Sequence, residues 1–352
     1  MRYERGIFLE KKQKLTELFL LTSFLCCFVV LIHTSSEGVT KLIIGSWQHK
    51  VFFMFNKALS FVVPGFVFLS GLKLTYSYKQ KPFHFLYFMK KRFLKILIPY
   101  IFWYIIYYRF LTSLEFMTEK TIQQHIFSFI MGDLISPFYF VTIIFQFYLL
   151  FGIFLYFVRK YKLIYVIIVS TIIQYVYLKY IYVPYDDRFF MTYFIYFVLG
   201  CSMAENLEFF KNKIQKYNIL IYVFFLFFVY WHITHSYAST IEGIIYRNWR
   251  IFTCLFSISG IFAFYHISYV ITQKASKWFL SIFKAIDASS FYIFLGHCYV
   301  LYSCNEHWFK VGIHSIFYKF ILNSIIVFFF SFFVSFLYVL CKKKWYSIYK
   351  KV

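Results

Sequence analysis

The sequence predicts an all-α, polytopic integral membrane protein with about ten transmembrane helices, and three observations support this fold class. Hydrophobic residues make up 61% of the 352 residues and charged residues only 14%, whereas a soluble domain is about one quarter charged. The apolar residues form long runs, and about 20 helical residues cross the ~30 Å core of a bilayer. Basic residues gather in the short polar connections between these runs, as they do in multi-pass membrane proteins.

The apolar segments follow one another with little sequence between them. The segments that we expect to span the membrane are, with approximate ends, 15–34, 51–72, 96–114, 135–158, 163–182, 189–204, 218–236, 251–271, 286–303 and 315–340. Segment 122–131 is too short to span, so we expect an interfacial or re-entrant piece there. No connection or terminus is long enough for a second folded domain, which predicts a single transmembrane domain over residues 1–352.

The distribution of positive charge predicts the orientation. Of the 37 Lys and Arg residues, 26 lie in one set of connections and nine in the other, while Lys57 and Lys319 lie inside spans. Under the positive-inside rule both termini are therefore cytoplasmic, in agreement with an even number of spans. The chain carries no nucleic-acid-binding motif, so its net charge of +23 indicates topology and contact with membrane lipids rather than nucleic acid. We expect a multi-pass protein of a bacterial plasma membrane.

Two histidines inside apolar segments are the first candidates for chemistry. His33 lies at the outer end of the first span, and His297 lies in the outer half of the ninth, which predicts a similar depth for both. Ionisable groups within spans are costly and are often functional, although a lone histidine can also be an inert hydrogen-bonding residue. An imidazole titrates near neutral pH and can remove a proton from a hydroxyl. No third ligand has a metal-binding spacing, so we expect no metal.

Local features of three segments lead to further expectations. Pro64 and Gly65 should loosen the second span, and Ser70 with Gly71 should let it end at the cytoplasmic face. Asp287 with Ser289 or Ser290 should cap the start of the ninth span. The seven cysteines include no CxxC pair, and five of them lie in apolar runs and are interpreted as small hydrophobic side chains: Cys26, Cys27, Cys201, Cys254 and Cys298. A link between Cys298 and Cys304 is conceivable but has no support.

A cationic cluster marks the cytoplasmic end of the third span. Lys91 and Lys95 are four residues apart and Arg92 is adjacent, so one helical face is basic. Such a face binds either an anionic lipid head group or the phosphates of a donor such as coenzyme A, and physical chemistry alone favours lipid. On the opposite side, Glu306 lies just beyond the ninth span, where it either orients a substrate or is solvated.

Several motifs, in this order, resemble those of the membrane-bound acyltransferase family 3, which covers bacterial sugar O-acyltransferases with about ten spans. In the first span, Glu17 and His33 match an acidic residue and a histidine of the family, while Thr22 stands where the family has an arginine. The other similar segments are PGFVFLSG at 64–71, Arg92 and Lys95 followed by ILIPY at 96–100, YFIYFVLG at 193–200, and SSFYIFLGH at 289–297. Within the family, the length and the Glu-Leu start are most similar to the intercellular adhesin protein C group, implicated in O-acylation of poly-N-acetylglucosamine.

The resemblance implies roles for particular residues. His33 is then the catalytic base, and His297 donates to or positions the acceptor. Arg92 and Lys95, with Lys91 beside them, bind acyl-CoA as co-substrate, either acetyl-CoA or succinyl-CoA. Glu17 and Glu306 are candidates for substrate contact, and the acceptor is an envelope glycan. In the predicted orientation the basic cluster is cytoplasmic and His33 is near the outer face, so either the pantetheine arm reaches up a cavity or the acyl group is relayed.

Two other classes of function stay open at this stage. The chain could export a polysaccharide or a lipid-linked sugar, with its histidines lining a polar path. It could also be a structural subunit of a polysaccharide synthase complex that uses its aromatic residues to pack partners. An acyltransferase that modifies a cell-envelope or extracellular polysaccharide is the function that the sequence favours.

Overall fold

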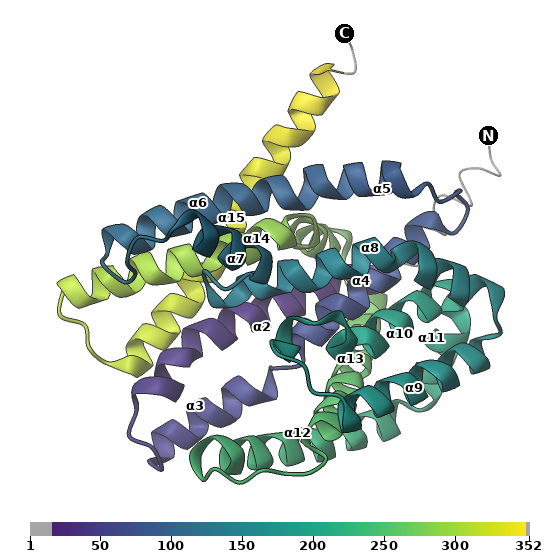
Figure 1. Cartoon of the computed structure of the whole chain (residues 1–352), viewed down its shortest axis with the longest axis horizontal. Helices are drawn as coiled ribbons and strands as arrows, with labels where there is room; N and C mark the ends of the chain where they lie inside the picture. The colour runs from purple at the N-terminus through teal and green to yellow at the C-terminus, as the bar shows by residue number, and fades with distance from the viewer. Residues whose placement is uncertain (1–15, 350–352) are drawn as a thin grey trace. The chain divides into compact units, whose positions relative to one another are not determined.

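The computed structural model describes the backbone of residues 16–349 and the side chains through Lys344, and in this part of the chain it contains helices and no strands (Figure 1). Among the described residues, nine helices are long and apolar enough to cross a membrane: Thr16–Lys41, Trp47–Tyr78, Phe85–Ser113, Ser136–Lys160, Leu163–Tyr180, Asn218–Ile241, Trp249–Lys274, Lys277–Lys310 and Ile316–Lys344. The expected short sixth segment is an apolar helix at Phe190–Glu205. The prediction of an all-α, multi-pass membrane protein is confirmed, whereas its orientation stays a prediction.

The basic clusters at both ends lie outside the described residues. They are Arg2, Arg5, Lys11, Lys12 and Lys14 at the start, and Lys350 and Lys351 at the end. The described chain forms two compact units, and the single domain over residues 1–352 stays a prediction.

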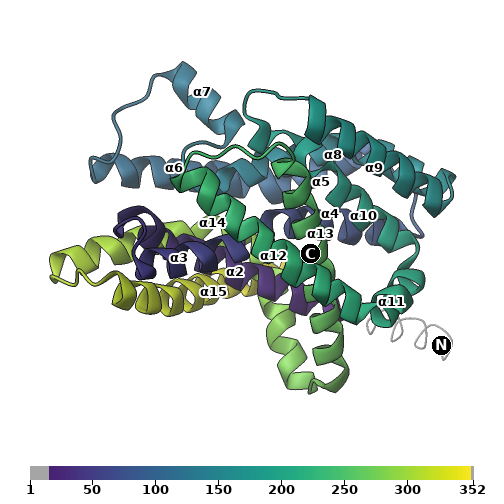
Figure 2. The ribbon, with the colours of Figure 1, turned by 90° about the horizontal axis from the view of Figure 1, so that it is seen from below.

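Unit 1 comprises Met1–Val62, Ile214–Arg247 and Leu255–Val352. Its helices are α2 (Thr16–Lys41), α3 (Trp47–Ala58), α12 (Asn218–Ile241), most of α13 (Trp249–Lys274), α14 (Lys277–Lys310) and α15 (Ile316–Tyr349). Helix α2 packs against α3, α14 and α15, which run beside it in Figure 2. Val30, Leu301 and Val327, one from each of α2, α14 and α15, form a buried apolar cluster between these helices.

Unit 2 comprises Val63–Lys213 and Asn248–Cys254. Its elements are α4 (Val62–Tyr78), α5 (Phe85–Arg92), the π-helix η1 (Phe93–Leu97), α6 (Ile98–Ser113), α7 (Ile122–Met131), η2 (Ser136–Phe138), α8 (Tyr139–Lys160), α9 (Leu163–Tyr180), η3 (Asp186–Arg188), η4 (Phe190–Tyr193), α10 (Phe194–Glu205) and most of α11 (Leu207–Lys216). Helices α8, α9 and α10 contact one another. The short segment 122–131 is the helix α7, which begins with a capping box at Thr121 and Gln124 and ends at Gly132 in the left-handed conformation.

The expected end of the second span at Ser70 and Gly71 is wrong, because α4 continues to Tyr78. Gly71 instead lies where a Cβ atom would be 2.4 Å from the carbonyl oxygen of Phe197. On α10, a Cβ atom at Gly200 would be 2.1 Å from the carbonyl oxygen of Phe68. The two glycines therefore let α4 and α10 approach through their backbones, as small residues do between membrane helices. The break in this span lies before Pro64, at residues 59–61 between α3 and α4.

The expected cap of the ninth span at Asp287 and Ser289 or Ser290 is also wrong. Helix α14 begins ten residues earlier, at Lys277, and its cap is Ser276, whose side chain accepts a hydrogen bond from the backbone N–H of Phe279. The expected span began only at residue 286, whereas the first turns of α14, which carry Lys277 and Lys284, are helical as well, and the Ser276 side chain caps one of their N–H groups.

Helix α2 likewise extends past the predicted end at Thr34, to Lys41. Its last two turns are polar, and their side chains have partners on neighbouring helices. The Thr34 hydroxyl is 2.9 Å from that of Ser324 on α15, and Lys319 on α15 donates to Glu37. His33 therefore lies inside a continuous helix and not at its end.

Candidate active site

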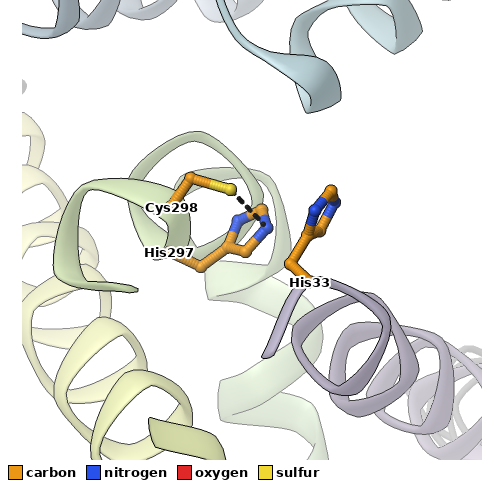
Figure 3. Close-up of side chains that lie close together, drawn as sticks. All are labelled: His33, His297 and Cys298. Atoms are coloured by element: carbon orange, nitrogen blue, oxygen red, sulfur yellow. Dashed lines mark hydrogen bonds between the residues drawn. The ribbon is translucent and has the colours of Figure 1, made fainter. Parts of the chain in front are cut away.

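His33 and His297 lie side by side although 264 residues separate them in the sequence. His33 is on α2 and His297 on α14, two helices that pack together in unit 1. Their ring centroids are 5.0 Å apart with a tilt of 51° between the rings (Figure 3). The structure thus brings together the two histidines that the sequence singled out, and their catalytic role stays a proposal.

The hydrogen bonds of His297 define its tautomer. Its Nδ1 atom is 2.8 Å from the carbonyl oxygen of Phe294 and 3.2 Å from that of Ile293, one turn back along α14. Since a carbonyl oxygen can only accept, Nδ1 carries the proton in the neutral ring and Nε2 keeps a lone pair. The helix therefore directs the Nε2 acceptor atom of His297 away from its own backbone.

His33 has an environment of a different kind. The described residues supply no hydrogen-bond partner for its ring, and the side chain is half-buried, whereas His297 is buried. The backbone around it is held firmly, because the Asn56 side chain donates to the carbonyl of Ile32 at 2.8 Å and to the Ser35 hydroxyl at 3.0 Å. His33 is thus a positioned imidazole that remains available to a hydroxyl from outside the protein.

Cys298 is the functional candidate that sequence reasoning missed. It was interpreted as a small hydrophobic residue, but its Sγ atom is 3.4 Å from Nε2 of His297 (Figure 3). Cys298 and Cys304 are both free thiols, so the conceivable link between them is not formed. The only signal in the sequence was the adjacency of Cys298 to His297.

The same three side chains are also a possible set of metal ligands. One nitrogen of His33, one of His297 and the sulfur of Cys298 all lie within 4.8 Å of one another. The prediction of no metal depended on the lack of a third ligand at a metal-binding spacing. That argument was incomplete, because Cys298 provides a third donor atom. Nitrogen and thiolate donors suit Zn²⁺, and the backbone contact of His297 Nδ1 is of the kind that orients a zinc-bound histidine.

The two carboxylates that the sequence suggested for substrate contact lie elsewhere. Glu17 is buried on α2, 16 residues or about 24 Å before His33, and accepts a hydrogen bond from the Tyr265 hydroxyl at 3.1 Å. Glu306 is nine residues past His297 on α14, about 13 Å away along the helix, and pairs with Lys310 at 3.2 Å. Thr22, at the position of the family's arginine, is buried and donates to the carbonyl of Leu18.

The basic residues expected to bind the donor belong to unit 2, at the junction of α5 and η1. The guanidinium of Arg92 lies over the rings of Phe88 and Tyr148, with its Cζ atom 5.1 and 5.5 Å from their centroids. Its Nε atom is buried without a hydrogen-bond partner in the described structure, and no carboxylate pairs with it there. Lys91 and Lys95 are exposed. Arg92 is therefore the best placed of the three to bind a buried anionic group.

Comparisons with known proteins agree with the resemblance that the motifs suggested. A family model described as an acyltransferase domain, of acyltransferase family 3, matches residues 20–340. This range includes His33, Arg92, Lys95, His297 and Cys298, but it begins after Glu17. Neither the curated proteins nor the solved structures contain a match to the chain.

Proposed function

Because the chain belongs to acyltransferase family 3, we propose that it transfers an acyl group, acetyl or succinyl, from acyl-CoA to a hydroxyl of a cell-envelope or extracellular polysaccharide. The observation that carries this proposal is the pair of facing imidazoles, His33 and His297, with ring centroids 5.0 Å apart. Transfer of an acyl group to a hydroxyl needs a base for the hydroxyl proton and a donor near the acyl oxygen, and a histidine can supply either.

In this proposal His33 is the general base. Its ring has no hydrogen-bond partner in the described structure, so a nitrogen can accept the proton of a sugar hydroxyl as the oxygen attacks the acyl carbon. His297 lies beside it with its tautomer held by the carbonyls of Ile293 and Phe294. It positions the acceptor hydroxyl through Nε2, or returns a proton to the leaving group when it is protonated.

The donor site in this proposal is centred on Arg92. A guanidinium held over two aromatic rings, with a buried N–H left unpaired in the described structure, is suited to a phosphate oxygen of coenzyme A. Lys91 and Lys95 add positive charge at the same helix junction and contact either the donor phosphates or anionic lipid. No metal is assigned a role in the transfer.

The acceptor class rests on the family, which covers sugar O-acyltransferases. The similarity to the intercellular adhesin protein C group favours a poly-N-acetylglucosamine-type polymer at a bacterial plasma membrane. Glu306, near the end of α14, is a candidate contact for a long acceptor because it is only partly buried. Glu17 is buried against Tyr265 and is suited to holding α2 in place.

The test is mass analysis of envelope glycan from cells with the gene, without it, and complemented with His33→Ala or His297→Ala. An acyltransferase adds one acyl mass per modified sugar, and this mass is lost in the deletion strain and in both variants while polymer still reaches the surface. The mass itself identifies an acetyl or a succinyl donor.

The same experiment distinguishes the rival functions. An exporter of polysaccharide or lipid-linked sugar would leave unmodified polymer inside the deletion strain, with acylation of the remaining surface polymer unchanged. A structural subunit of a synthase complex would lower the amount of polymer and be insensitive to the two histidine substitutions. Either result would refute the acyltransferase proposal.

A further inference from the structure

The pairing of Cys298 with His297 has the geometry of a nucleophile and its base. The Sγ atom is 3.4 Å from Nε2, within the range of a sulfur hydrogen bond, and both side chains are buried, with Cys298 1% and His297 0% exposed. Because His297 Nδ1 donates its proton to the carbonyls of Phe294 and Ile293, Nε2 must be the acceptor and the thiol the donor. A nucleophile, a base, and a third group that orients the base are the features of covalent acyl transfer.

The environment of Cys298 differs from that of another buried cysteine in the protein. The Sγ atom of Cys201 faces the carbonyl oxygen of Gly71 at 3.7 Å, and a carbonyl cannot remove the thiol proton. Cys304 lies six residues further along α14 and is only partly buried. Among these three cysteines, Cys298 alone contacts a basic nitrogen in the described structure, so the arrangement is not a general consequence of burying a thiol.

The site also contains a second base for a second step. His33 and His297 face each other from different helices, and the nitrogen of His33 lies within 4.8 Å of both the sulfur and the His297 nitrogen. One imidazole can therefore accept the proton of the thiol while the other accepts the proton of an incoming hydroxyl. His33 is half-buried and the other two are buried, so reactants reach the thiol from the side of His33.

We propose that Cys298 carries the acyl group as a covalent thioester between the donor and the acceptor. This inference rests on the proposed function and adds an intermediate to it. The transfer then takes place in two displacements at one site in unit 1.

Each displacement is balanced. In the first, His297 Nε2 takes the thiol proton, the Cys298 sulfur attacks the acyl carbon of acyl-CoA, and the bond from that carbon to the coenzyme A sulfur breaks. The coenzyme A sulfur leaves with the proton from His297. In the second, His33 takes the proton of the acceptor hydroxyl, whose oxygen attacks the acyl carbon on Cys298. The bond to the Cys298 sulfur breaks, and the proton returns from His33 to this sulfur.

A metal ion bound by the same three atoms is the competing explanation. The group of three contains no carboxylate, so a divalent ion with a single thiolate would leave a net positive charge within the apolar spans, which is costly. A thiol hydrogen-bonded to a neutral imidazole carries no net charge and avoids this cost. The uncharged pair is therefore favoured, and metal content becomes an outcome of the test.

The test is acyl labelling of the full-length protein in detergent or nanodiscs, without acceptor. Acetyl-CoA and succinyl-CoA, each radiolabelled in the acyl group, are the two donors, and the chain is examined after denaturation. We expect up to one acyl group per chain, released by neutral hydroxylamine as a thioester and located on the peptide that contains Cys298. Cys298→Ala should reduce the label to background and lower glycan acylation by about 100-fold or more.

Matched variants keep the test decisive. Cys304→Ala, on the same helix, should retain the label and the activity, and gel filtration checks that both variants fold. Cys298→Ser should either lose the label or form an ester that resists neutral hydroxylamine. His297→Gln should slow labelling, whereas His33→Gln should accumulate label, because it blocks only the second displacement.

Three results would overturn the intermediate. Two of them are unlabelled wild-type protein and a fully active Cys298→Ala variant, each in a strain whose glycan is acylated. The third is a stoichiometric metal in the wild-type protein that is lost in Cys298→Ala, because a coordinated thiolate is not a free nucleophile. A wild-type strain with no acylated glycan refutes the proposed function instead, so the two failures are distinguishable.

Discussion

Two polar groups of side chains, one in each unit, make opposite use of their hydrogen bonds. The ion-pair cluster of unit 2 joins Asp186 to Arg250, whose Nη2 atom donates to both carboxylate oxygens at 2.9 and 2.8 Å. The Nη1 atom of Arg250 donates to the backbone carbonyls of Tyr177 and Leu178 in the last turn of α9. It also donates to the carbonyl of Ile181, the residue that follows this helix. Here the polar atoms satisfy one another, and the cluster ties α13 to the end of α9.

The histidine group of unit 1 differs because it leaves the ring of His33 available. His33 has no hydrogen-bond partner for its ring in the described structure, and His297 places Nδ1 on its own backbone while Nε2 contacts the Cys298 thiol. Hydrogen bonds that are completed within the protein stabilise a fold, whereas positioned groups without partners can bind and react. The comparison therefore assigns stability to the cluster at Asp186 and chemistry to the group at His33.

The largest effect should come from His33→Gln. This substitution keeps a polar side chain but removes the base, so kcat for glycan acylation should fall by about 10²- to 10⁴-fold, with little change in thermal stability. His235→Gln is the matched control, since His235 stacks on Trp231 at 3.9 Å and contacts its carbonyl. Equal loss of activity in both variants would contradict the special role of His33.

A smaller effect is expected from Arg92→Gln. The loss of a charge-assisted hydrogen bond to the donor should raise KM for acyl-CoA by about 10- to 100-fold, with kcat changed much less. Lys91→Gln, at an exposed neighbour, should raise KM only a few-fold. An unchanged KM in Arg92→Gln, together with weaker association with anionic vesicles, would assign the cluster to lipid instead.

Arg250→Ala should affect stability more than catalysis. Removing the guanidinium that donates to both oxygens of Asp186 should lower the free energy of unfolding by about 2–3 kcal/mol, because a half-buried carboxylate and several backbone carbonyls lose their donor. Thermal unfolding in detergent measures the change, and Arg250→Lys should recover part of it. If activity per folded molecule fell as in His33→Gln, the distinction between the two groups would be wrong.

The smallest effect should follow Ser60→Ala. His232 is a buried histidine of unit 1 with a partner, since its Nε2 atom is 3.0 Å from the Ser60 hydroxyl and its ring stacks on Phe256 at 4.5 Å. The substitution should lower stability by about 1 kcal/mol and leave kcat unchanged, which unfolding and glycan-acylation assays measure. A loss of kcat would mean that a histidine with a hydrogen-bond partner also takes part in the chemistry.

The sequence by itself determined the fold class and most of the candidate site. Burial in a bilayer is a property of a contiguous run of residues, so hydropathy located all ten apolar segments, and the short helix at 122–131 was recognised by its length. His33 and His297 were identifiable because ionisable side chains inside apolar runs are unusual, and Arg92 was identifiable because it lies in a basic cluster on one helical face. Sequence motifs then identified the family.

Only the tertiary structure decided how these residues combine. The contact between His33 and His297, the close backbone approach at Gly71 and Gly200, and the extension of α2 to Lys41 depend on segments far apart in the chain. The start of α14 depends instead on a local cap, which hydropathy does not detect. Cys298 combines both kinds of information: its sulfur contacts the neighbouring His297 on the same helix, and only the fold places the His33 nitrogen within 4.8 Å of both. Packing of α2 on α14 brings His33 to this pair, whereas hydropathy describes only the transfer of each segment into the membrane.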